Sequence, residues 1–189
     1  AFNVISDMLT TRVGTLTAKQ ERYMEWKTKD GEYESTTIAD YTTFFQGIFD
    51  KHRFLDLIQN FLCFDKADGK AWKILGAYHQ YFAVNKALQR TFDAVKGDGK
   101  IGVFWHTQGS GKSFSMLFFT HLVIKHFAES TILVVTDRKD LDQQLYGQCG
   151  RCKEFLRTEP VNATSRTELI ELLKNRQSGG IIFTTIQKF

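Results

Sequence analysis

The sequence predicts an α/β protein in which a parallel sheet is flanked by helices and preceded by a mainly helical extension. Three short apolar runs, at 101–105, 131–136 and 180–185, are rich in β-branched or aromatic side chains. Runs that are apolar on both faces are typical of strands buried between two helical layers. Because helices separate these runs, we expect the strands to pair in parallel through right-handed crossovers.

The composition is that of an ordinary soluble globular domain, with 42% apolar and 24% charged residues among 189. A net charge of +4 is compatible with nucleic acid but does not by itself indicate it. The longest apolar stretch, 116–127, is interrupted by polar side chains, so no membrane span is expected. No secretory signal is recognisable, and three cysteines do not form an even disulfide framework. We therefore expect a cytoplasmic protein with no membrane partner.

The first part of the chain is expected to lack strands. Residues 1–33 are polar with weak periodicity and are predicted to be irregular, with one short helix at most. From 42 to 64 the apolar residues recur at spacings of three and four, which predicts packed helices. Residues 65–70 interrupt this pattern. A second helical stripe covers 78–95, and the Gly-Asp-Gly at 97–99 is a helix stop signal.

Two further helices are predicted downstream. Residues 113–128 are apolar nearly all round, as in a helix buried against a sheet. Ser165 and Glu168 have the spacing of a capping box, and the helix that they open should end near the glycines at 179–180. The third expected strand lies at the end of the sequence. Since three parallel strands leave an open sheet edge, we expect the sheet to be incomplete and the chain to be a fragment.

A phosphate-binding loop is the most specific motif. The segment HTQGSGKS at 106–113 follows a predicted strand and opens a predicted helix, which is the context that a P-loop of a nucleoside-triphosphatase needs. Glycine at 109 and 111 lets backbone amides turn toward phosphates, and the helix adds its positive N-terminal end. Lys112 supplies the counter-charge and the Ser113 hydroxyl reaches Mg²⁺. The candidate ATP-binding residues are Thr107, Gln108, Gly109, Ser110, Gly111, Lys112 and Ser113, with Lys112 and Ser113 catalytic and Ser113 the Mg²⁺ ligand.

The loop departs from the usual pattern at one position. His106 stands where the pattern GxxxxGK[ST] has its first glycine. Many helicase-type loops also lack that glycine, so the difference bears on the subclass rather than on binding. An accidental glycine-rich turn is the alternative interpretation of the segment.

Four segments together resemble the restriction (motor) subunit of type I restriction-modification enzymes. They are AYHQYFAVNKA at 77–87, GVFWHTQGSGKS at 102–113, VTDRKDL at 135–141 and IFTTIQKF at 182–189. The stretch FDKHRFLDLI at 49–58 is similar as well, so the likeness covers nearly the whole chain. Four motifs in order at family-like spacing are far more specific than any one of them.

The resemblance implies a superfamily 2 helicase-like motor with a RecA-like fold. Such a motor hydrolyses ATP to pull double-stranded DNA past a complex anchored by methyltransferase and specificity subunits, and then cleaves remotely. Carried over to this sequence, Gln80 would read the adenine. The residues that would face the DNA backbone are Thr136 and Arg138 after the second strand, and Thr184 and Thr185 after the third.

The resemblance also implies a division of the chain and some missing parts. Residues 1–70 would link an upstream nuclease domain to the motor, and 71–189 would begin the first motor domain. The Asp-Glu pair that completes the Mg²⁺ site in the family does not occur in the sequence. We therefore expect the isolated fragment not to turn over ATP, and the nuclease site to lie outside this chain.

Several residues have alternative interpretations. Asp137 ends an apolar run and could be a Mg²⁺-binding carboxylate, although the basic residues at 138–139 would then lie beside the metal. Gln80 could be an ordinary helix-surface residue, and Thr184 and Thr185 could be simple strand-end hydroxyls. Another P-loop ATPase or a kinase that does not act on DNA is the alternative function, and a non-catalytic nucleotide-binding scaffold is a third.

Two further motifs are weak. Asp7 with Glu25 and Lys27 imitates the acidic-x-Lys pattern of restriction nucleases, but that pattern requires adjacent strands, which are not predicted here. Cys149 and Cys152 form a lone CxxC without a second pair, so two ordinary buried thiols are expected rather than a zinc site.

Overall fold

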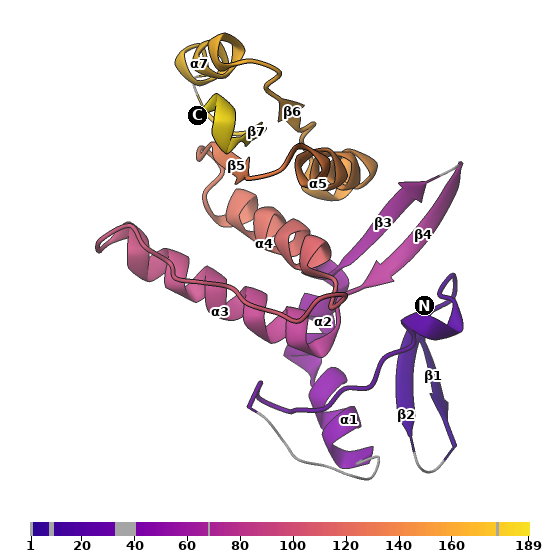
Figure 1. The fold of residues 1–189 in the computed structure, drawn as a ribbon. Coiled ribbons are helices and arrows are strands. Elements are labelled where there is room, and N and C mark those ends of the chain that lie inside the picture. The colour runs from indigo at the N-terminus through magenta and orange to yellow at the C-terminus, as the bar shows by residue number, and fades with distance from the viewer. Residues whose placement is uncertain (1, 8–9, 33–40, 68, 177) are drawn as a thin grey trace. The chain divides into compact units, whose positions relative to one another are not determined.

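The computed structural model describes residues 2–7, 10–32, 41–67, 69–176 and 178–189. The chain forms two compact units, residues 1–119 and 120–189, whose elements are labelled in Figure 1. The helix α4 (Lys112–His126) runs from the end of the first unit into the second. None of the helices in the described ranges is long and apolar enough to cross a membrane.

The first unit begins with a β-hairpin. Strands β1 (Phe2–Ser6) and β2 (Thr11–Thr15) pair antiparallel, and the short helix η1 (Gln20–Arg22) follows. A further backbone bridge joins Val13 to Met24. The prediction that residues 1–33 are irregular is therefore wrong. Thr11, Val13 and Thr15 are buried while β1 is mostly exposed, and neither strand has the regular alternation of apolar and polar residues by which a strand is recognised in sequence.

The predicted helices between 42 and 64 are present, but they end earlier than expected. Helices α1 (Tyr41–Ile48) and α2 (Lys51–Asn60) are followed by an antiparallel hairpin of β3 (Leu62–Ala67) and β4 (Lys70–Leu75). Asp50 caps α2 by accepting a hydrogen bond from the Arg53 amide at 3.1 Å. The predicted interruption at 65–70 is thus the end of a hairpin, and the extension is only partly helical.

The two hairpins are tied together by threonine hydroxyls. Thr15 donates its hydroxyl to the Lys73 carbonyl at 2.8 Å, and the Lys73 amide donates to the Thr17 hydroxyl at 2.9 Å. Since backbone groups at a strand edge need partners, these contacts fix β2 against β4.

Aromatic side chains form the core of the first unit. Helix α3 (Tyr78–Val95) occupies the predicted range, and its C-terminal turn is followed by Gly97 as expected. The Phe61 ring lies 4.8 Å from the Tyr81 ring and 5.3 Å from the Phe118 ring of α4, measured between centroids. Phe61 and Phe118 are fully buried. These contacts hold α3 and the start of α4 around the end of α2.

The predicted strand at 101–105 is not formed. Residues 101–107 have no regular secondary structure, and the side chains of Val103 and Trp105 are 96% and 77% exposed. A strand requires a hydrogen-bonded neighbour, and none of the strand pairings among the described residues includes this segment. Its apolar composition alone therefore does not make it a strand.

The second unit is a parallel three-stranded sheet with helices. Strands β5 (Ile132–Thr136), β6 (Val161–Asn162) and β7 (Ile181–Thr185) lie in the order β5-β7-β6, and both pairings are parallel. The parallel pairing predicted for the runs at 131–136 and 180–185 is confirmed, whereas β6 was not predicted. The connecting elements are α5 (Lys139–Arg151), α6 (Lys153–Leu156) and α7 (Arg166–Lys174), and η2 (Ile186–Lys188) follows β7.

The central strand of this sheet is its core. All five residues of β7 are buried, as expected for a strand with neighbours on both sides. Ile182 packs with Ala163 and Leu169, and Leu133 and Leu172 lie against them. Ser165 opens α7 as predicted, because its side chain accepts a hydrogen bond from the Glu168 amide at 3.1 Å.

The Ser165 cap gives a stability prediction. Replacing Ser165 by Ala leaves the Glu168 amide without its side-chain acceptor, so the free energy of unfolding should fall by about 1 kcal/mol. Urea denaturation followed by circular dichroism measures this change. The control is Thr167→Ala at an exposed position of the same helix turn, which should change stability by a few tenths of a kcal/mol at most. Equal losses in both variants would contradict the capping role.

Candidate functional site

The glycine-rich loop turns directly into α4. Gly109 and Gly111 both have φ +79°, in the left-handed region where a side chain is strained. The amides of Phe114 and Ser115 donate to the Gly111 carbonyl at 2.9 and 3.1 Å, which begins the helix. The predicted helix after the loop is therefore confirmed, and its N-terminal end lies at the loop.

The side chain of Lys112 is folded onto the loop. Its ammonium donates to the carbonyl oxygens of His106 and Thr107 at 3.0 and 2.8 Å. The Ser110 hydroxyl also donates to the Thr107 carbonyl, at 2.8 Å. Lys112 is exposed at the surface of the unit. The cation is thus held over the loop by neutral acceptors, which an anion can replace without breaking an ion pair.

Gln80 joins the first turn of α3 to this loop. Its side-chain amide nitrogen donates to the Gly111 carbonyl at 2.9 Å, and its oxygen accepts from the Ala77 amide at 2.9 Å. The residue is 6% exposed, so it is not the helix-surface residue of the alternative interpretation. Each end of a primary amide has capacity for one more hydrogen bond. Gln80 can therefore position the loop and still offer one donor and one acceptor.

The contact with Gln80 explains the glycine at 111. A Cβ at Gly111 would lie 2.8 Å from the Gln80 amide nitrogen, whereas at Gly109 a Cβ would meet open space. The two glycines are therefore needed for different reasons. Gly111 allows both the left-handed backbone and the approach of Gln80, while Gly109 needs only the backbone conformation.

His106, which replaces the first glycine of the usual pattern, packs among rings. Its ring centroid lies 5.2 Å from that of His79 and 4.6 Å from that of Phe104. Burial and the nearby charges of His79 and Lys112 lower the pKa of His106, so its imidazole is neutral at pH 7. Its Nδ1 has no hydrogen-bond partner among the described residues. The Nε2 atom of His79 lies 3.1 Å from the Ser110 carbonyl oxygen, and this contact supports the loop.

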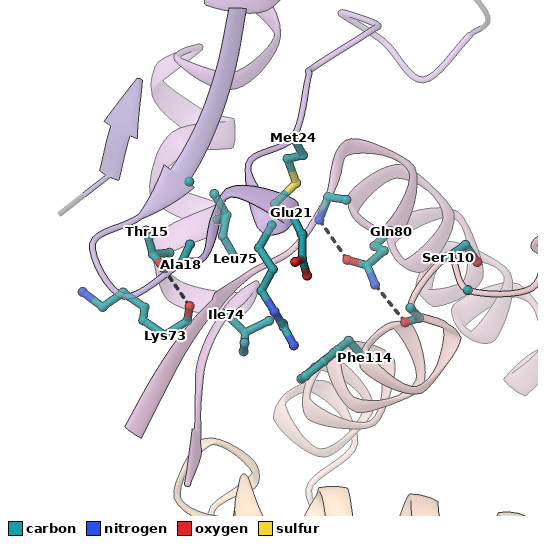
Figure 2. Close-up of a pocket in the computed structure, with 15 residues that line it drawn as sticks. Thr15, Ala18, Glu21, Met24, Lys73, Ile74, Leu75, Gln80, Ser110 and Phe114 are labelled. Atoms are coloured by element: carbon teal, nitrogen blue, oxygen red, sulfur yellow. Dashed lines mark hydrogen bonds between the residues drawn. The ribbon is translucent and has the colours of Figure 1, made fainter. Parts of the chain in front are cut away.

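A pocket of about 230 Å³ opens beside the loop (Figure 2). Its lining combines the loop with the starts of α3 and α4, the end of β4, and the segment around η1. The lining residues are Gly14, Thr15, Ala18, Glu21, Arg22, Met24, Lys73, Ile74, Leu75, Ala77, Gln80, Gly109, Ser110, Gly111 and Phe114. Apolar walls with a few polar groups are the usual character of a small-molecule pocket.

The loop has the features that a phosphate group needs. It combines two left-handed glycines, a helix N-terminus and a lysine without a carboxylate partner in the described hydrogen bonds and ion pairs. Lys112 would hold the phosphates, and the Ser113 side chain, at the second position of α4, would hold a magnesium ion. Thr107 and Gln108 are exposed at the rim of the loop.

In the second unit, the predicted residues Thr136 and Thr185 end adjacent strands. They are directly paired in the register of β5 and β7. The Thr136 hydroxyl lies 3.3 to 3.4 Å from the Arg138 carbonyl, an Asp142 oxygen and the Thr184 carbonyl, and Thr136 is 7% exposed. The threonine side chains thus face the interior of the unit rather than its surface.

Thr184 and Thr185 are buried without satisfying their hydroxyls. They are 0% and 1% exposed, and neither hydroxyl has a hydrogen-bond partner among the described residues. An unpaired buried hydroxyl is costly. Packing alone therefore does not explain why these two buried positions carry a hydroxyl group.

Arg138 is the exposed member of the predicted set. Its guanidinium donates twice to Asp140, from Nε at 3.1 Å and from Nη2 at 2.6 Å. This hydrogen bonding lowers the pKa of Asp140. Both side chains are about two-thirds exposed, and surface ion pairs contribute little to stability. A phosphate can therefore compete with Asp140 for the arginine at small cost.

Asp142, which sequence reasoning missed, organises this strand end. It is 3% exposed, faces Thr136, and accepts a hydrogen bond from the side-chain Nδ2 of Asn162 at 2.6 Å. Gln187 adds a second tie by donating to the Asp137 carbonyl at 2.9 Å. A buried carboxylate three residues into a helix is not distinguishable in sequence from an ordinary acidic residue of the first turn. Only the pairing with Asn162 shows its role.

The expectation that no adjacent strands occur near the nuclease-like pattern at Asp7, Glu25 and Lys27 is wrong. Adjacent strands do exist there, because β1 and β2 form a hairpin. However, Glu25 forms ion pairs with Lys27 at 3.0 Å and with Arg12 at 3.7 Å. The described residues contain no group of three or more histidine, cysteine or acidic side chains arranged to hold a metal ion.

The CxxC cysteines are buried in the second unit. Cys149 is 9% exposed and Cys152 is 1% exposed, and neither forms a disulfide. Burial raises the pKa of the Cys149 thiol to about 12. The thiol is therefore protonated at neutral pH and is a poor nucleophile, in agreement with the prediction of ordinary buried thiols.

The chain belongs to the SWI2/SNF2 ATPase family, whose model matches residues 79–189, more than half of the sequence. This match begins at the start of α3 and includes both the glycine-rich loop and the two strand-end motifs. It places the chain among ATPases.

The more specific likeness is to type I restriction enzymes. The chain is 40% identical, over 98% of its length, to the type I restriction enzyme HindI endonuclease subunit of Haemophilus influenzae. It is 32% identical, again over 98% of its length, to the putative type I restriction enzyme MjaIXP endonuclease subunit of Methanocaldococcus jannaschii. The chain spans about a fifth of the length of these curated relatives, 18% and 19% respectively. The resemblance inferred from the motifs is confirmed.

The geometry at Gly111 gives a binding prediction. Gly111→Ala forces a left-handed alanine and drives its Cβ against Gln80. We expect the dissociation constant for ATP to rise at least tenfold, measured by titration calorimetry with the 189-residue chain. Gly150→Ala is the control, because a Cβ there meets nothing within 4 Å; it should bind ATP as the unchanged chain does. Normal ATP binding by Gly111→Ala would contradict the proposed loop geometry.

Proposed function

We propose that this chain is the ATP-binding part of a double-stranded DNA translocase within a type I restriction endonuclease subunit. The observation that carries the proposal is the loop at 106–113, in which left-handed glycines, a helix start and an exposed lysine occur together. The proposed ligands are ATP and Mg²⁺, with Lys112 and Ser113 acting on the phosphates and the metal.

Gln80 has two roles in this proposal. It holds the loop through Gly111, and its remaining hydrogen-bonding capacity reads the adenine edge. An amide offers one donor and one acceptor side by side, which matches the amino group and ring nitrogen of adenine. The buried position of Gln80 favours this dual role over a surface role.

The proposal extends to the fold and its boundaries. Residues 71–189 would begin a RecA-like motor domain, and 1–70 would link it to a nuclease domain. The carboxylates that complete the Mg²⁺ site, the arginine that meets the developing charge, and the nuclease site would all lie outside this chain. For this reason the chain alone is expected to bind ATP without turning it over.

DNA contact is proposed at the strand ends of the second unit. Arg138 is exposed there and is held only by a surface ion pair. Thr136, Thr184 and Thr185 would support the DNA-facing backbone, since their side chains are buried beneath it. A P-loop enzyme that does not act on DNA, such as a small-molecule kinase, has no use for a basic group at this position. The SWI2/SNF2 match also favours the motor over the kinase and scaffold alternatives.

The assembly is proposed from the names of the relatives, which are endonuclease subunits of type I restriction enzymes. The partners would be double-stranded DNA and the methyltransferase and specificity subunits of such a system. A cytoplasmic location follows from a DNA substrate of this kind.

The phosphate role of Lys112 is tested by hydrolysis. In the intact subunit, Lys112→Ala should reduce ATP turnover at least a hundredfold while leaving the circular dichroism melt unchanged, because the lysine is exposed and outside the core. Lys125→Ala removes the same charge from the last turn of the same helix and should retain turnover. Full turnover by Lys112→Ala would reject the phosphate site.

The DNA role of Arg138 is tested by salt dependence. Arg138→Ala should weaken DNA binding by the intact subunit equally for all sequences and reduce the slope of log affinity against log salt by about one unit. Asp140→Ala frees the guanidinium and should strengthen binding instead. Lys153→Ala, an ion-paired surface lysine elsewhere in the unit, is the charge control. An unchanged slope in Arg138→Ala would show that this arginine does not contact a phosphate.

A further inference from the structure

The pocket beside the loop has one wall that the P-loop motif does not explain. This wall comes from the N-terminal segment that follows the first hairpin, and it contributes Ala18, Glu21, Arg22 and Met24. Opposite it are Gln80, the loop glycines and Phe114 of α4. In Figure 2 the labelled side chains of Glu21, Gln80 and Phe114 surround the same open space. A ligand that fills this pocket therefore contacts both the glycine-rich loop and the N-terminal segment.

Arg22 and Phe114 both line this space, and the Arg22 guanidinium lies over the Phe114 ring in a cation–π contact. The guanidinium carbon of Arg22 lies 5.9 Å from the centroid of the Phe114 ring. Arg22 is exposed and Phe114 is half-buried, so this contact can open to admit a flat ring between the two side chains without disturbing the core. A planar arginine and an aromatic ring are the two side chains on which nucleic-acid bases stack.

The charges of the pocket argue against a second phosphate site. The carboxylate of Glu21 lies in the same lining as the Arg22 guanidinium, so the two charges offset each other. Lys73 also lines the pocket, but its ammonium lies over the Phe64 ring, 5.4 Å from the centroid. Ile74, Leu75 and Met24 add apolar walls, and the other polar side chains of the lining, those of Thr15, Gln80 and Ser110, are uncharged. A flat, uncharged heterocycle fits this lining better than an anion does.

We propose that Arg22 stacks on the base of the nucleotide whose phosphates the loop holds, with Phe114 supporting the opposite face. The proposal rests on the phosphate role of the loop stated above and extends it to a residue of the N-terminal segment. Arg22 is a base-contacting residue and takes no part in the chemistry at the phosphates. Gln80 then reads the edge of a base whose plane Arg22 and Phe114 define.

The experiment separates the base from the phosphates by using two probes, ATP and inorganic tripolyphosphate. Titration calorimetry with the 189-residue chain gives the dissociation constant of each. Arg22→Ala should raise the dissociation constant for ATP about tenfold, as expected for the loss of one stacking partner. The dissociation constant for tripolyphosphate should stay within twofold, because that probe has no base.

Two more variants test stacking itself. Arg22→Lys keeps the positive charge and loses the planar fork, so it should bind ATP as weakly as Arg22→Ala does. Phe114→Leu keeps an apolar side chain at this position and should also weaken ATP but not tripolyphosphate. Lys19→Ala is the matched control, since it removes a charge from the same segment at a residue that does not line the pocket; it should change neither constant. Circular dichroism melts verify that each variant is folded.

The outcomes distinguish this inference from the proposed function. If Lys112→Ala weakens both probes and Arg22→Ala weakens neither, the loop binds phosphate and the stacking proposal is rejected. If Arg22→Ala weakens both probes equally, or if Arg22→Lys restores ATP binding, Arg22 acts through charge and the proposal is also rejected. If Lys112→Ala changes neither probe, the proposed function itself fails.

Discussion

The buried amide of Gln80 is the constraint on which the pocket beside the glycine-rich loop depends. An amide that is 6% exposed must find partners for both of its ends, and here they are the Ala77 amide and the Gly111 carbonyl. Ala77 directly follows Gly76, whose amide donates to the Phe61 carbonyl at 2.8 Å. A Cβ at Gly76 would lie 3.2 Å from atoms of both Phe61 and Phe118. The position of the loop therefore follows from the packing of the aromatic core through an unbroken series of short contacts.

The sequence predicted what depends on local signals and failed where pairing decides. Helix α3, the start of α4 and the cap at Ser165 follow from periodicity, from a glycine-rich turn and from one hydroxyl, all within a few residues. The two N-terminal hairpins depend on which backbone lies alongside, and their short strands carry little alternation. The segment at 101–105 shows the opposite error: its apolar composition is typical of a strand, but no strand in the described part of the chain pairs with it. The same limit applies to the site. Motifs predict the loop residues and Gln80 as candidate site residues, whereas the contacts of Arg22 and Asp142 are made with neighbours distant in sequence and have no local signal.

The threonines at the strand ends of the second unit have two different hydrogen-bonding environments. Thr136 is surrounded by acceptors that include Asp142, and Asp142 is fixed in turn by Asn162. Thr184 and Thr185 have no such partners among the described residues and remain buried. The hydrogen bonds of Thr136 and Asp142 fix the turn after β5. The hydrogen bond that Gln187 donates to the Asp137 carbonyl also fixes the backbone of this turn. The second environment leaves two buried hydroxyls without a partner among the described residues. The two neighbouring strand ends thus differ in how their hydroxyls are hydrogen-bonded.

The N-terminal segment acquires a function if the base of the nucleotide lies against Arg22. The first hairpin is attached to β4 through Thr15 and Thr17, and β4 leads into the turn that carries Ala77. A ligand that touches η1, the loop and α4 together stabilises all of them, because binding to the folded form alone adds to its stability in proportion to the logarithm of ligand concentration. Residues 1–70, predicted as a link between domains, would then report the state of the nucleotide site to whatever precedes them. If the base binds against this wall, nucleotide binding and the stability of the N-terminal hairpin would be coupled, so that strengthening one would strengthen the other.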